Sequence, residues 1–222
     1  MPSSRGIYNY LCNGEPSGIQ ETWECEQSAT QRHITSIRHA RPVGIRLRVS
    51  SLEVDGVFQN CRIHWRQELS EGSRELSADY CFDDSGIRVH VHDGQREVQL
   101  QESASQYLFS PLMRIYNGGV LRGLLAAGGS GQVLVPYIAD PEQTDRLLHP
   151  TWSERHAELL GDSQLQVDGR KLACTEYDYS GGEYPVGTRF WLDAGDVMLR
   201  YCWQQDEKTR WQVDLADYEP AS

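Results

Sequence analysis

The sequence lacks the apolar segments that direct a chain into or across a membrane. Its first 18 residues contain no apolar run of signal-peptide length and no myristoylation pattern. The most apolar stretch, residues 108–127, is interrupted by two arginines and a Gly-Gly pair, which makes it unsuitable for crossing a bilayer. We therefore expect a cytoplasmic protein with no stable membrane insertion.

Closely spaced cysteine pairs are absent as well. None of the six cysteines belongs to a CxxC motif. In a reducing compartment, isolated cysteines of this kind are mostly small buried hydrophobic residues. The even count leaves disulfides open if the chain is exported.

Positive charge is scarce. The chain has 21 Lys and Arg residues against 32 Asp and Glu residues, which gives a formal net charge of −11. Phosphate backbones need local positive charge, so we expect no nucleic-acid partner for the chain as a whole.

The sequence also lacks a GxSxG elbow and a complete phosphate-binding loop. The glycine-rich segment Gly123–Gln132 has no Lys-Ser/Thr ending, and no clear strand and helix flank it. We interpret this segment as a flexible connection. No cofactor is predicted.

Apolar and polar residues alternate along much of the chain. In residues 165–215 the alternation is broken at short intervals by turn-forming pairs such as Gly181-Gly182. A strand turns successive side chains to opposite faces, and all-β chains of 222 residues are commonly one domain. The sequence predicts one mainly β domain over residues 1–222, an antiparallel meander that forms a barrel or a curved half-barrel.

The segment at about residues 107–131 breaks this alternation. Ser110-Pro111 is a typical helix start, and Leu112, Ile115 and Tyr116 keep helical spacing. Gly118-Gly119 is expected to end or break that helix. The sequence therefore predicts a short inserted helix followed by the glycine-rich connection.

Basic residues gather on the polar side of the strands expected between residues 45 and 92. We call this set the basic strip: Arg46, Arg48, Arg62, His64, Arg66, Arg88, His90 and His92. Arginine forks suit a carboxylate or a phosphate, which makes Arg46, Arg62 and Arg88 candidates for holding an acidic headgroup. The alternative is a solvated sheet face whose cations pair with Glu53, Asp55 and Glu97.

A metal site is the other hypothesis for this region. His90 and His92 share one strand face, and His64 is a conceivable third ligand. No further His-and-carboxylate spacing of the kind found in mononuclear sites accompanies them, so we predict no metal.

The aromatic residues are mainly tryptophan and tyrosine, with six Trp and eleven Tyr against four Phe. Their polar atoms suit half-buried sheet faces and ligand pockets. We expect the following residues to line an apolar concave face: Trp65, Trp191, Tyr201, Trp203 and Trp211. Such a face predicts binding of a small apolar or amphiphilic molecule, while ordinary strand packing is the alternative.

Two further functions stay open. An enzyme acting on a hydrophobic substrate in the same cavity would use Glu176, Tyr177, Asp178 or Tyr179, because these groups are able to transfer protons. On a strand, the two tyrosines share one face and the two carboxylates the other. An interaction protein would instead present an exposed apolar patch. The oligomeric state does not follow from the sequence.

The C-terminal layout, DGRKLACTEYDYSG followed by GTRFWLDAGDVMLRYCW, resembles the closing strands of bacterial twisted-sheet families. The segment FSPLMRIYNGG is similar to the helical insert of DUF3108-type proteins. Those families resemble lipoprotein carriers in outline, which implies a curved antiparallel sheet with apolar ligands on its concave side. The resemblance covers about half the chain, and no binding residue carries over from it.

Overall fold

The computed structural model describes residues 3–93, 97–102, 108–167 and 169–220. Within them, fifteen strands form one sheet in the order β8-β7-β6-β5-β4-β3-β2-β1-β15-β14-β13-β12-β11-β10-β9. The prediction of a mainly β fold with a curved antiparallel sheet is confirmed. The sheet is an open half-barrel, because β8 and β9 stand at its two ends and do not pair with each other. No helix of the described residues has the length and apolar character of a membrane span.

We divide the sheet into two arms. The first arm contains β1 (Ser3–Cys12), β2 (Glu15–Gln27), β3 (Gln31–Ala40), β4 (Ile45–Val54), β5 (Val57–Glu68), β6 (Ser73–Asp83), β7 (Gly86–His92) and β8 (Glu97–Glu102). A 3-10 turn, η1 (Arg41–Val43), joins β3 to β4. The second arm contains β9 (Leu108–Phe109), β10 (Ser130–Pro136), β11 (Pro150–Val167), β12 (Arg170–Ser180), β13 (Arg189–Leu192), β14 (Met198–Gln204) and β15 (Arg210–Glu219). Antiparallel pairing of β1 with β15 joins the arms, whereas β9 and β10 are parallel.

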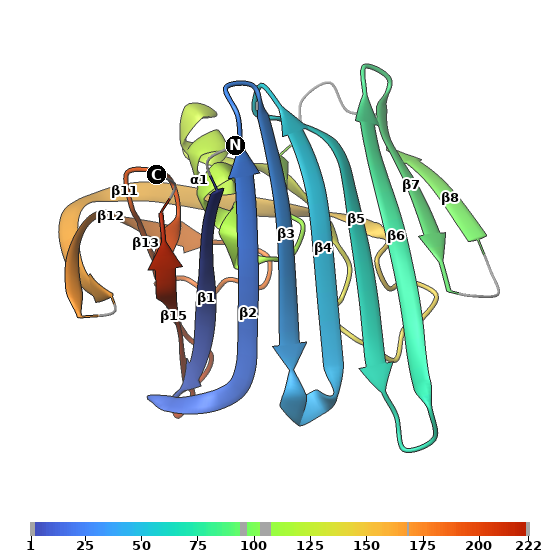
Figure 1. Ribbon diagram of the computed structural model, residues 1–222, viewed down its shortest axis with the longest axis horizontal. Helices are drawn as coiled ribbons and strands as arrows, with labels where there is room; N and C mark the ends of the chain where they lie inside the picture. The colour runs from blue at the N-terminus through green and yellow to red at the C-terminus, as the bar shows by residue number, and fades with distance from the viewer. Residues whose placement is uncertain (1–2, 94–96, 103–107, 168, 221–222) are drawn as a thin grey trace.

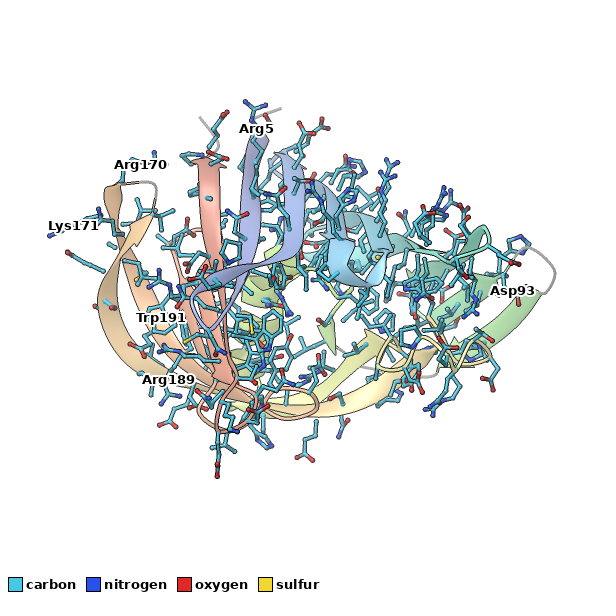
Figure 2. All side chains as sticks on the ribbon, turned by 90° about the horizontal axis from the view of Figure 1, so that it is seen from below. Arg5, Asp93, Arg170, Lys171, Arg189 and Trp191 are labelled. Atoms are coloured by element: carbon cyan, nitrogen blue, oxygen red, sulfur yellow. The ribbon has the colours of Figure 1, made fainter. Side chains whose placement is uncertain are left out.

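The second arm folds back over the first. In Figure 1, β11 passes behind the strands of the first arm, and the helix α1 (Asn117–Ala126) lies on that same side. Seen from below, the sheet curls around its packed side chains, with Arg5, Arg170 and Lys171 at the outer edge (Figure 2). We call the enclosed side the concave face and the solvent side the convex face. One buried core runs across both arms on the concave face.

The inserted helix begins later than the sequence predicted. A 3-10 turn, η2 (Arg114–Tyr116), leads directly into α1, which contains both Gly118 and Gly119. The expected break at this glycine pair is therefore wrong. A Cβ atom on Gly118 would lie 1.9 Å from the backbone oxygen of Asp196, so glycine is needed here for close approach rather than for ending a helix. The glycine-rich segment that follows divides between α1, a turn and β10.

A buried ionic cluster fastens the inserted segment to the first arm. Glu21 on β2 is 0% exposed, because it lies in phase with the buried Trp23 and Cys25. Its carboxylate accepts hydrogen bonds from four donors: Tyr10 Oη, Ser36 Oγ, the Arg38 guanidinium and the backbone N–H of Arg114. The buried charge is thus fully surrounded by donors, as a buried carboxylate requires.

Arg114 extends this cluster to the second arm. Its guanidinium donates to Tyr10 Oη at 3.1 Å and to Tyr184 Oη at 2.9 Å, and it lies 4.9 Å from the ring centroid of Tyr201. Arg155 lies 4.5 Å from the centroid of the Tyr184 ring and donates a hydrogen bond to Glu183. The segment before α1 therefore contacts both arms through charged and aromatic groups.

We predict that Glu21→Gln lowers the free energy of unfolding by about 3–5 kcal/mol, because it leaves the partly buried Arg38 guanidinium without its carboxylate partner. Glu24→Gln is the matched control. Glu24 is exposed on the other face of the same strand, so a change within about 0.5 kcal/mol is expected. Urea denaturation measures both. Equal losses of unfolding free energy in the two variants would show that the ionic cluster makes no specific contribution to stability.

Candidate functional site

A cavity lies at one end of the half-barrel, on the concave face. Its volume is about 550 Å³. The β4–β5 turn and the β6–β7 turn form one side of it, and β9, η2 and α1 form the other. The inserted segment therefore closes this cavity against the first arm.

Aromatic side chains form the cavity wall. The ring centroid of Phe58 is 5.6 Å from that of Phe82, 5.1 Å from Phe109 and 6.0 Å from Tyr116. The Phe58 and Phe109 rings meet edge to face, at 88°. We call these four residues the aromatic box. Offset and edge-to-face contacts of this kind add to the apolar burial of the rings.

A register shift places Phe58 in the box. On β5 the buried residues are Cys61, Ile63 and Trp65, so strict alternation would turn Phe58 to the convex face. Between β4 and β5 the register changes: Leu52 faces Asn60, but Glu53 faces Phe58. The extra residue, Gln59, reverses the phase and brings Phe58 to the same side as Glu53.

An ion pair lies at the polar side of the cavity. Glu53, on β4, is 8% exposed, and its Oε2 lies 3.6 Å from Nη1 of Arg32 on β3. Arg32 Nε also donates to Cys25 Sγ at 3.4 Å. Burial raises the pKa of the Glu53 carboxyl, and the Arg32 charge opposes that shift. Sequence analysis missed this group as a cavity residue, although Glu53 is in phase with Leu47 and Val49.

The aromatic residues expected from the sequence lie in three places, and none of them lines this cavity. Trp65 is 2% exposed in the core of the first arm. Tyr201, Trp203 and Trp211 form a continuous stack, with centroid separations of 4.5 and 5.6 Å. Trp191 alternates with buried Phe190 and Leu192 and faces the convex side, opposite Glu176 and Arg200.

The basic strip lies on the convex face, away from the cavity. Arg62 pairs with Asp79 at 2.6 Å and Arg88 with Asp83 at 2.9 Å, whereas Arg46 lies between His39 and Arg66. Glu53, one of the expected partners of the strip, is on the concave face instead. The side chain of Glu97 is outside the described residues.

The histidines of the strip occupy neighbouring strands. His64 faces Ser77, which in turn faces His92, and His90 faces Asp79. His64 also lies 3.4 Å from Glu75. In the part of the chain that the structure describes, no group of three His, Cys, Asp or Glu residues is placed to hold a metal ion.

The acid–base candidates on β12 are divided between the two faces. Tyr177 and Tyr179 are buried on the concave face, where burial raises the pKa of Tyr179. Glu176 and Asp178 are on the convex face, and both pair with Arg189. None of these four residues lines the cavity described above.

No protein-family model and no curated protein matches the chain. Among solved structures, a β-barrel-like protein of the domain of unknown function DUF1849 from Brucella abortus is similar, with a TM-score of 0.58 and 13% identity over 100% of this chain and 99% of that chain. A DUF1089 family protein from Pseudomonas aeruginosa has a TM-score of 0.44 and 18% identity over 83% of this chain and 89% of that chain.

The first likeness shows a shared β-barrel-like fold and nothing further, because the identity is low. The second is too distant to carry an argument. The expectation of a β-barrel-like fold is thus supported, while a relation to DUF3108-type proteins is not shown.

The raised pKa of Glu53 predicts a pH dependence of stability. The folded state favours the protonated carboxyl, so this group stabilises folding most below its unfolded pKa of 4.5, and the contribution falls as pH rises through the folded pKa. Glu53→Gln stays neutral throughout. We expect its melting temperature, relative to the parent protein, to rise between about pH 4 and about pH 8. A difference that does not vary with pH would contradict the raised pKa.

Proposed function

We propose that the protein binds a small amphiphilic molecule in the cavity between the first arm and α1. The observation that carries this proposal is the aromatic box beside the buried Arg32–Glu53 pair. An apolar wall with a few convergent polar groups is the usual composition of small-molecule sites, and about 550 Å³ lies within their usual range.

The two parts of the cavity suggest how such a ligand lies. Its apolar part would contact the rings of Phe58, Phe82 and Phe109, and its polar part would face Arg32 and Glu53. The resemblance to lipoprotein-carrier-like sheets agrees with an amphiphilic ligand on the concave face. The stack of Tyr201, Trp203 and Trp211 is the rival location for the same function.

Binding of the neutral fluorophore N-phenyl-1-naphthylamine tests the proposal. We predict saturable binding of the fluorophore to the native protein. Its affinity should fall about tenfold in Phe58→Ala, because loss of one well-packed aromatic contact typically costs about 1–2 kcal/mol of binding free energy. Phe58 is only partly buried, which favours a folded variant.

Trp203→Ala is the matched control, since it removes an aromatic ring outside the cavity. Its affinity for the fluorophore should equal that of the parent protein. Weakened binding in Trp203→Ala with unchanged binding in Phe58→Ala would move the site to the stack. Absence of saturable binding to the parent protein would contradict the proposed function itself. Circular dichroism of each variant checks the fold.

A further inference from the structure

Two carboxylates on the concave face differ in how well they are satisfied. Glu21 accepts hydrogen bonds from four donors, and its closest arginine nitrogen is 2.7 Å away. Glu53 is nearly as buried, yet its ion pair with Arg32 measures 3.6 Å. A buried carboxylate with so long a contact retains unused capacity to accept hydrogen bonds or to pair with a cation.

Glu53 is also the carboxylate that reaches a cavity. Of the described residues lining that cavity, three carry carboxylates (Glu53, Asp83 and Asp84) and one carries a guanidinium, Arg32. Hydrogen bonds from Ser85, and then the charge of Arg88, lower the pKa of Asp83 and keep it ionised at the mouth. The charge of the lining is therefore net negative.

The aromatic box also attracts a positively charged ligand. The faces of aromatic rings are negative, and a cation within about 6 Å of a ring centroid is attracted to it. Four rings line the cavity beside Glu53 and pack against one another: Phe58, Phe82, Phe109 and Tyr116. An anionic group in the cavity would meet this net negative lining, in which Arg32 is the one cationic side chain among the described residues.

We propose that the ligand of this cavity is a cationic amphiphile, whose ammonium group lies against the aromatic box and pairs with Glu53. This inference rests on the proposed function. Arg32 competes with the ligand for Glu53, and the ligand's ammonium displaces it in part from the carboxylate.

Three ligands with one alkyl chain separate the charge preference from binding itself. Isothermal titration at about pH 8 compares octylammonium, octanol and octanoate on the full chain. We expect octylammonium to bind at least about tenfold more tightly than octanol, and octanoate to bind more weakly than octanol. Octanol binding as tight as octylammonium, or tighter octanoate binding, would overturn the cationic preference and leave the proposed function standing. Failure of all three to bind would overturn the proposed function.

Variants with opposite expected effects sharpen the test. Glu53→Gln should bring octylammonium and octanol to nearly equal affinity, whereas Arg32→Gln should increase the preference for octylammonium. Glu75→Gln is the control, because it removes the same charge from an exposed position on the convex face. A loss of preference in Glu75→Gln equal to that in Glu53→Gln would mean that the net charge of the protein, and not the cavity, selects the ligand. If Glu53→Gln fails to fold, the parent protein's order of affinities and the Arg32→Gln result decide alone.

Discussion

The buried carboxylate of Glu21 is the group on which the arrangement of the two arms depends. A buried charge requires hydrogen-bond donors, and those around Glu21 come from β1, β3 and the segment that precedes α1. Arg114 in that segment also contacts Tyr184 and Tyr201 of the second arm. One ionic cluster thus holds the inserted segment between the arms and fixes where η2 and α1 lie over the first arm.

The position of the cavity follows from this attachment. Once Arg114 is held at Glu21, the chain on either side of it is short: Phe109 lies five residues before, and Tyr116 and Val120 lie shortly after. Phe109 and Tyr116 contact the ring of Phe58 beside the cavity. The cluster that stabilises the fold is therefore separate from the cavity, but it sets one of the cavity walls.

The alternation of apolar and polar residues predicted most of the fold, but it predicted neither the ionic cluster around Glu21 nor the cavity beside Glu53. Leu47 and Val49 face the core, and Arg46 and Arg48, which alternate with them, face solvent, as period-two patterning requires. Glu21 and Glu53 follow the same phase, but a carboxylate among apolar residues gives no sign of which donors surround it, because those donors come from distant strands. The register shift at Gln59 is equally invisible, since bulges depend on pairing between strands. The same holds for Gly118, whose neighbour Asp196 is far away in the sequence.

Glu21 and Glu53 differ in how many partners the fold supplies to their carboxylates, and this difference bears on both stability and the proposed ligand binding. Glu21 is satisfied by the fold and needs nothing more, so its charge stabilises the empty protein. Glu53 is buried with one long ion pair, and burial raises its pKa, which means that its ionised form lowers the stability of the empty protein. A cation that binds only the folded state relieves that cost and stabilises the protein by mass action. Under our proposal, the ligand's ammonium pairs with Glu53 and offsets the cost of burying its charge.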